Sequence, residues 1–180
     1  GADILIQWHA VPGNWRPTHP NLIICIQHSN WHLRQHFGSP QKAPKRKLFN
    51  LKDPLQPGAW ASWVIHAKWS PGKDGLVRIW KDGDVVLDEK GPNAYGTIGK
   101  EYTPYLKAGL YHSEWHLNSE ARKKRYEAEI PGVTKKETYV AKVVVGSESA
   151  THEMMASCLE FQKEGDDEPK SVPVDSAPWT

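Results

Sequence analysis

Residues 105–111 read Tyr-Leu-Lys-Ala-Gly-Leu-Tyr, and this stretch decides how the rest of the chain is interpreted. With the two-residue period of a β-strand, Leu106, Ala108 and Leu110 share one face, which can pack into a core. The other face presents two phenols and an ammonium group. Gly109 stands between them, at a point where a ligand could approach the backbone closely.

A second alternating stretch, Ile-Leu-Ile-Gln-Trp-His at residues 4–9, places Gln7 and His9 on one face. An amide, an imidazole, an ammonium and a phenol on two strands are the groups that a proton-transfer site for an anionic substrate needs. Alternation alone does not exclude the alternative that the polar and aromatic side chains of both stretches only pack in the fold. Tyrosine is a good strand former, and a single histidine beside a tryptophan is common in cores and on surfaces.

Length and composition fit one domain with a sizeable core. The 180 residues include 23 basic and 21 acidic side chains, so the overall charge gives no signal for a nucleic-acid partner. Two local basic clusters, residues 42–47 and 122–125, are either solvated loops or sites that attract a polyanionic chain. No apolar run approaches the length of a membrane span, so no membrane partner is expected. Cys25 and Cys158 permit one disulfide, require none, and fit no metal-binding spacing.

Short alternating or apolar stretches between Gly/Pro-rich turns predict the secondary structure. They indicate an all-β fold, a two-sheet antiparallel β-sandwich of the jelly-roll, concanavalin-like type, with one sheet curved around a groove. Residues 1–163 would form this domain and residues 164–180 a polar, solvated tail. A hairpin turn is expected at Asp82-Gly83 and a long loop at residues 38–59. The expected strands are residues 4–9, 22–27, 31–36, 60–69, 76–80, 85–88, 105–111 and 139–145, with a last edge at 159–161.

Two of these strands carry further candidate ligand-binding groups. In residues 31–36, two histidines and an arginine share a face that either lines a groove for acidic sugars or is the wet outer face of an edge strand. In residues 60–69, a histidine and a lysine alternate with tryptophans, which stack on sugar rings or fill a core. The binding candidates are His32, Arg34, His66 and Lys68, with Tyr105 and Lys107 from the opening stretch.

Residues 7–9, Gln-Trp-His, resemble the Gln-x-His motif of the jelly-roll polysaccharide lyases, and residues 105–111 resemble their Tyr-Phe-Lys-x-Gly-x-Tyr motif. The middle of the chain is most similar to the heparinase I and glucuronan lyase branch, through residues 60–69, 75–83 and 91–95. Alginate lyases share the two short motifs but are less similar in this middle part. Each motif alone is moderately specific, whereas both motifs in order, with this middle part between them, are a strong signal.

The resemblance implies β-elimination across a 4-linked uronic acid. A base removes the C5 proton, the bond from C4 to the glycosidic oxygen breaks, and an unsaturated uronate remains at the new non-reducing end. Gln7 would stabilise the charge that develops on the uronate carboxylate, and His9 would share this role or act as the base. Tyr111 would protonate the leaving oxygen and could also be the base. Lys107 would hold a carboxylate in an adjacent subsite, because four strand residues, ~13 Å, separate it from Tyr111.

The resemblance also implies a substrate class and a location. The partner would be an acidic polysaccharide, with glucuronan favoured over heparin, heparan sulfate or alginate, and the protein would be secreted or periplasmic. No cofactor is needed for the chemistry, and a structural calcium ion is allowed by the analogy without assigned ligands. Two other functions remain open: a non-catalytic carbohydrate-binding module and, ranked last, a glycoside hydrolase, which needs two carboxylates flanking the bond.

The chain departs from the family at its start. Only six residues precede Gln7, whereas the family usually has several strands there, often with an arginine that binds the substrate carboxylate. We therefore expect the usual N-terminal strands to be missing and an exposed sheet edge or core surface to lie near residues 4–9. Another segment or a second chain would complete the sheet.

Overall fold

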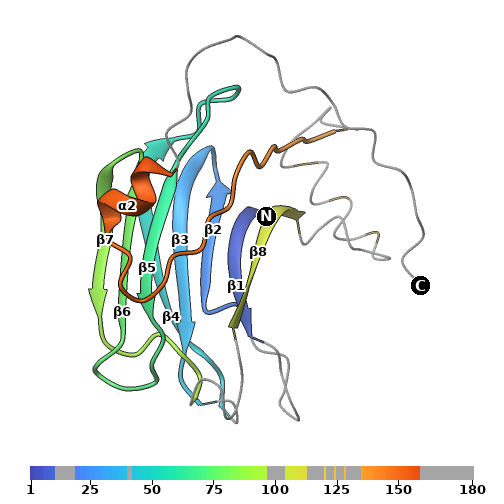
Figure 1. The fold of residues 1–180 in the computed structure, drawn as a ribbon. Coiled ribbons are helices and arrows are strands. Elements are labelled where there is room, and N and C mark those ends of the chain that lie inside the picture. Colours follow the sequence, from blue (N-terminus) through green and yellow to red (C-terminus); the bar gives the residue numbers. More distant parts are fainter. Residues whose placement is uncertain are drawn as a thin grey trace, which may run out of the picture.

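The fold is seen in a computed structural model that describes residues 1–10, 19–39, 42–96, 104–112 and 135–158 and the single positions 120, 124 and 128. Its strands form two antiparallel sheets (Figure 1), which confirms the predicted all-β class. The larger sheet has the order β4-β3-β2-β1-β8 and the smaller one the order β5-β6-β7. The strands are β1 Asp3–Ala10, β2 Leu22–Gln27, β3 Asn30–Phe37, β4 Lys45–Pro54, β5 Trp63–Lys68, β6 Leu76–Lys81, β7 Asp84–Lys90 and β8 Pro104–His112.

The core lies between the small sheet and the β2–β3 part of the large sheet. Trp31 of β3 meets Trp63 of β5 edge to face, with ring centroids 5.1 Å apart. Burial follows the alternation of residues 31–36 and 60–69, except that His36 is also buried, on the face opposite to Trp31. The buried cluster consists of Leu22, Ile24, Ile26, Trp31, Leu33, Val77, Ile79 and Leu87.

β4 was not predicted, because its Lys- and Pro-rich composition resembled a loop. It is a ten-residue strand paired antiparallel with β3, and Phe49 and Leu51 pack against the core. Ion pairs join β4 to the small sheet, from Lys47 to Glu89 of β7 at 2.7 Å and from Asp53 to Lys81 of β6 at 2.9 Å. The expected loop over residues 38–59 is therefore wrong for its central part.

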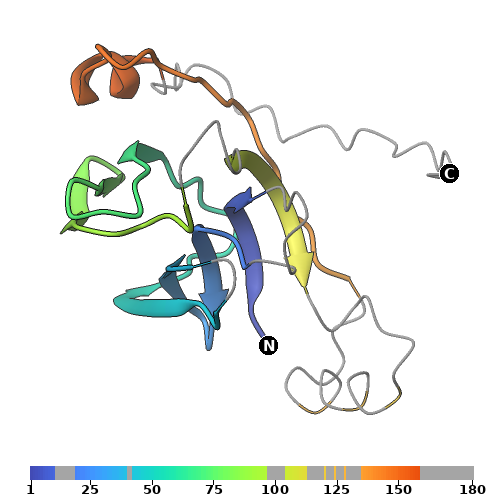
Figure 2. The same cartoon turned by 90° about the horizontal axis from the view of Figure 1, so that it is seen from below.

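β1 lies inside the large sheet, between β2 and β8, with backbone pairing on both sides. The predicted exposed edge at residues 4–9 is therefore wrong. The alternative form of that prediction, an incompletely covered core surface, fits better, since Ile6 and Trp8 are only half-buried. Figures 1 and 2 show why: β1 and β8 extend beyond the small sheet that covers β2 and β3.

Residues 135–151 run past β8 on the side of the small sheet (Figure 2). The strand expected at residues 139–145 is wrong, because this segment pairs with none of the described strands and three of its four valines are exposed. Near its start, Lys136 Nζ lies 2.6 Å from Asp3 Oδ2, and His112 Nδ1 lies 2.6 Å from the other oxygen of the same carboxylate. The edge expected at residues 159–161 and the tail 164–180 fall outside the described residues.

The short helix α2 (His152–Ser157) lies against the outer face of the small sheet (Figure 1). The hydroxyl of Thr151 caps its first turn by accepting a hydrogen bond from the Met154 backbone N–H. The His152 ring stacks on Trp80 of β6, with centroids 4.5 Å apart. No helix in the described ranges is long and apolar enough to cross a membrane.

Asn93 links the two sheets at one end of the sandwich. Its buried amide nitrogen donates to the carbonyls of Lys68 and Leu76, and its side-chain oxygen accepts from the Ser70 backbone. Asn21, just before β2, donates in turn to the Asn93 carbonyl at 3.1 Å. The segment 91–95, which carries part of the family resemblance, therefore has a structural role.

Candidate active site

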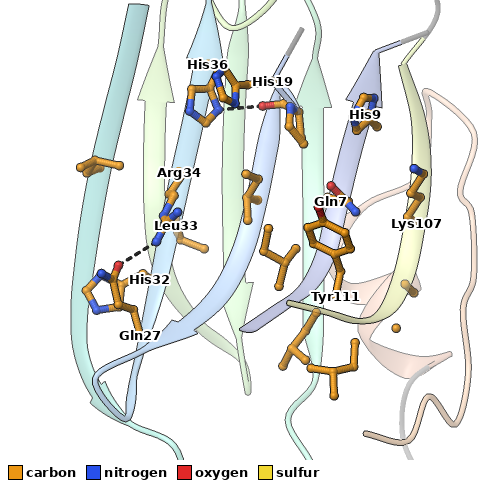
Figure 3. A pocket seen from close by; sticks show the side chains of 18 of the residues that line it. Gln7, His9, His19, Gln27, His32, Leu33, Arg34, His36, Lys107 and Tyr111 are labelled. Atoms are coloured by element: carbon orange, nitrogen blue, oxygen red, sulfur yellow. Dashed lines mark hydrogen bonds between the residues drawn. The ribbon is translucent and has the colours of Figure 1, made fainter. Parts of the chain in front are cut away.

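The large sheet has a groove on the face turned away from the small sheet (Figure 3). Its volume is about 1050 Å³, and its walls come from β1, β2, β3, β4 and β8 and from residues 19 and 20. The polar side chains that line it are Gln7, His9, His19, Gln27, His32, Arg34, His36, Arg46, Lys107 and Tyr111.

Strand pairing brings the residues of the two sequence motifs together. Gln7 is the register partner of Lys107, and His9 is the partner of Tyr105. The His9 and Tyr105 rings lie 5.8 Å apart between centroids. Figure 3 shows the Tyr111 ring leaning toward the Gln7 amide, so that Gln7 lies between His9 and Tyr111. A sugar placed over Gln7 would have an imidazole toward one side and a phenol toward the other.

A bulge in β8 sets the position of Tyr111. Ala108 pairs with Ile6 and Tyr111 pairs with Ile4, so β8 has one more residue than β1 between these pairs. Gly109 takes up the extra length at φ 138°, a conformation that L side chains rarely adopt. This glycine therefore has a backbone role, in addition to the open approach that the sequence suggested.

Lys107 lies toward the His9 end of the groove (Figure 3). Its ammonium group sits over the Tyr105 ring, 5.1 Å from the centroid. The role of Lys107 in holding a carboxylate of an adjacent subsite stays a prediction, since Lys107 is itself the strand partner of Gln7.

The other side of the groove holds a second polar cluster on β2, β3 and β4. Arg34 donates from Nη2 to Gln27 Oε1 at 2.7 Å, and His32 lines the same wall. The His36 ring stacks on His19, with centroids 4.9 Å apart and planes 23° apart. His19, Gln27 and Arg46 were not among the sequence candidates. Arg46 could have been found only by recognising β4 as a strand.

His36 is neutral at physiological pH. Burial lowers its pKa to about 4, and the nearby His19, Arg34 and Arg46 act in the same direction. Its Nδ1 lies 2.9 Å from the Pro20 carbonyl oxygen. Because a carbonyl only accepts, Nδ1 carries the proton and Nε2 is an acceptor in the neutral ring.

The charged side chains that line the described part of the groove are all positive. Arg34, Arg46 and Lys107 contribute three positive groups, and none of the described lining residues is Asp or Glu. No carboxylate within the described part of the chain forms an ion pair with these three side chains. Such a surface attracts anions, and it lacks the pair of carboxylates that a glycoside hydrolase needs.

Three of the candidate binding residues, Tyr105, His66 and Lys68, do not line the groove. Tyr105 lies next to it, against the His9 ring and under the Lys107 ammonium group. His66 and Lys68 alternate with Ile65 and Ala67, which pack against the core, so both point outward from the small sheet. Lys68 forms an ion pair with Asp74 at 2.9 Å. Strand alternation predicted correctly that His66 and Lys68 face away from the tryptophans, but it could not tell to which sheet the strand belongs.

The described residues contain no group of three or more His, Cys, Asp or Glu side chains arranged to hold a metal ion. The calcium ion allowed by the family analogy stays a prediction. Cys25 is buried and Cys158 is exposed, and both are free thiols.

The fold and groove define a β-sandwich protein with a cationic, carbohydrate-sized groove on its larger sheet. A family model described as polysaccharide lyase matches residues 2–139. The chain therefore belongs to the polysaccharide lyase family.

Among solved structures, the chain is similar to endo-β-1,4-glucuronan lyase from the fungus Trichoderma reesei, with 27% sequence identity and a TM-score of 0.51. The similarity covers 64% of this chain and 50% of the fungal one, so this chain spans about half the length of that enzyme. Among curated protein sequences, none is similar enough to this chain to count as a match.

Proposed function

We propose that this protein is a lyase that cleaves a 4-linked polyuronate, with glucuronan favoured, by β-elimination in the groove of the large sheet. One observation carries the proposal: Gln7, His9 and Tyr111, which belong to two motifs a hundred residues apart in sequence, lie along one groove whose described walls contain no acid. Family membership and the similarity to the fungal glucuronan lyase support the reaction class and the polymer.

The proposed chemistry begins with the uronate carboxylate at Gln7. The amide donates a hydrogen bond to the carboxylate, and His9 adds charge stabilisation, so that the negative charge developing as the C5 proton leaves is held in place. The electrons of the C5–H bond form the C4–C5 double bond, and the C4–O bond breaks. The leaving glycosidic oxygen then takes up a proton.

Stereochemistry assigns the proton transfers. In glucuronate the C5 hydrogen and the C4 oxygen lie on the same side of the ring, so one residue can remove the first proton and return it to the leaving oxygen. Tyr111 suits both steps, because its ring leans toward Gln7 from one side. In iduronate the two groups lie on opposite sides, so His9 would act as the base and Tyr111 as the acid. We favour the first scheme.

A secreted or periplasmic location follows from the proposed substrate, since long acidic polysaccharides are found outside the cytoplasm. A carbohydrate-binding module is the second candidate, because the same basic groove could hold the polymer without cleaving it. The two functions differ in one respect: only the lyase needs the phenol of Tyr111 within reach of the sugar at Gln7.

The test is the ultraviolet absorbance of the unsaturated product, measured with glucuronan, heparin, heparan sulfate and alginate. We expect turnover with glucuronan. In Tyr111→Phe, turnover should be lost while polymer binding is largely retained, because the hydroxyl acts in the transition state. His9→Ala should reduce turnover less severely.

Three results would change this assignment. Full activity of Tyr111→Phe on glucuronan would contradict the mechanism. Complete loss in His9→Ala, with a preference for iduronate-rich polymer, would favour the scheme with separate base and acid. Binding of glucuronan with no product from the unaltered protein would favour the binding module.

A further inference from the structure

The second polar cluster of the groove has no part in the proposed elimination step. Across the sheet, Gln7 pairs with Ile23 and Ile23 pairs with Arg34, so one apolar residue separates the Gln7 position from the Arg34 position. Neighbouring strands are ~4.8 Å apart, which places the Arg34 backbone ~10 Å from that of Gln7. This separation is larger than one sugar unit, so the two positions would contact different units of a bound chain.

Arg34 is oriented without being neutralised. Gln27 Oε1 accepts from Arg34 Nη2 at 2.7 Å, and this amide is uncharged. In the described part of the chain no carboxylate pairs with Arg34. The guanidinium therefore keeps its full charge and retains donors for a ligand carboxylate, which arginine binds through two parallel hydrogen bonds.

His36 adds an acceptor to the same wall. Its Nδ1–H is engaged by the Pro20 carbonyl at 2.9 Å, which leaves Nε2 as the acceptor of a neutral ring. His19 stacks against this ring and limits its movement. A fixed cation next to a fixed acceptor matches a uronate unit, which presents a carboxylate and neighbouring hydroxyl groups.

We propose that Arg34, oriented by Gln27, binds the carboxylate of a second uronate unit, distinct from the unit that is cleaved at Gln7. Arg34 is then a specificity-determining residue: it favours substrates long enough to reach both positions. This inference rests on the proposed lyase function and adds to it a requirement for chain length.

The experiment compares glucuronan oligosaccharides of increasing length with the polymer, for the unaltered protein and for Arg34→Gln. We expect KM for the polymer to rise about 10-fold or more, because a charge-assisted contact is lost, while kcat changes little. The preference for long over short substrates should weaken. Gln27→Glu is the second variant: the new carboxylate would neutralise Arg34 without removing it, and it should raise KM in the same way.

Arg78→Gln is the matched control, since Arg78 lies on the outer face of the small sheet and pairs with Asp88. It should leave KM and length preference unchanged, and thermal unfolding checks that all variants fold. If the unaltered protein neither binds nor cleaves any polyuronate, the proposed function fails and this inference fails with it. If it cleaves glucuronan, but Arg34→Gln and Gln27→Glu keep its KM and length preference, the second uronate position is refuted while the lyase function stands.

Discussion

The groove face of the large sheet and the outer face of the small sheet both carry positive side chains, but their charges are balanced differently. On the outer face, Arg78 pairs with Asp88, and Lys68 pairs with Asp74 at 2.9 Å. In the groove, Arg34 is bound by a neutral amide, and Lys107 lies over an aromatic ring. The outer charges are thus compensated within the fold, whereas the groove charges remain available for a ligand.

The largest expected difference between the two faces is in the response to pH. The pKa of His36 is lowered to about 4 in the folded protein, whereas an unfolded histidine titrates near ~6.5. Between these values the unfolded chain binds a proton that the folded protein does not, so stability falls as pH drops from ~6.5 to ~4. Over two pH units this corresponds to ~2–3 kcal/mol.

Urea unfolding at pH 7 and pH 4.5 measures this loss. His36→Asn, which keeps a donor for the Pro20 carbonyl, should show a smaller loss of stability than the unaltered protein. His66→Asn, at an exposed histidine of the outer face, should show the same loss as the unaltered protein. Equal pH dependence in His36→Asn and the unaltered protein would contradict the prediction.

The second contrast concerns two glycines with positive φ. Gly109 (φ 138°) lies in the β8 bulge, and Gly83 (φ 94°) lies in the β6–β7 turn, and an added Cβ would meet no atom within 4 Å at either position. Alanine is therefore strained by its φ alone at both sites. Only at position 109 would relief of that strain move Tyr111, and a misplacement of ~1 Å can reduce turnover about 100-fold.

Gly109→Ala should thus lower kcat roughly 10- to 100-fold, and Gly83→Ala should leave it unchanged. Product absorbance gives kcat, and thermal unfolding gives the stability cost of each substitution, which should be similar. A normal kcat in Gly109→Ala would show that the bulge does not set the position of the phenol.

The groove could be predicted from the sequence where strand alternation alone decides the face of a side chain. Gln7, His9 and Lys107 alternate with apolar residues, and strand pairing brings them together, whereas the position of Tyr111 also depends on the β8 bulge. The same rule failed for His66 and Lys68, because alternation separates two faces of a strand but does not identify the sheet. Which strands pair depends on residues far apart in the sequence, and the local alternation of one strand does not contain this information.

The other differences have similar causes. β4 was missed because lysine and proline content outweighed its alternation, although its pairing with β3 supplies Arg46 to the groove. The valine-rich residues 139–145 have the composition of a strand, but none of the strands that the structure describes pairs with them. The β8 bulge could not be predicted from the sequence of β8, since a register shift depends on both strands of a pair.

The third contrast compares two lysines, one on each face. In the Tyr111→Phe background, which allows binding to be measured without turnover, Lys107→Ala should weaken glucuronan binding several-fold. Lys68→Ala should have no effect, since that side chain is paired with Asp74 outside the groove. Affinity electrophoresis in gels containing glucuronan provides the measurement.

Added salt should reduce the Lys107 effect, because the interaction of exposed charges is screened. If Lys68→Ala weakened binding as much as Lys107→Ala does, the polymer would also contact the small sheet, and the groove would not be the whole binding surface.

The smallest effect is expected from the outer-face pair itself. Arg78 and Asp88 are register partners on β6 and β7, and their exposed side chains are joined by an ion pair. Surface pairs gain little, because water already solvates both charges and two long side chains must be held in place. A double-mutant cycle of Arg78→Ala and Asp88→Ala, followed by urea unfolding, should give a coupling energy near the detection limit. Polymer affinity should be unchanged in all three variants. A large coupling energy would mean that the Arg78–Asp88 pair stabilises the sandwich. The ion pairs of the outer face would then contribute to folding in addition to neutralising its charges.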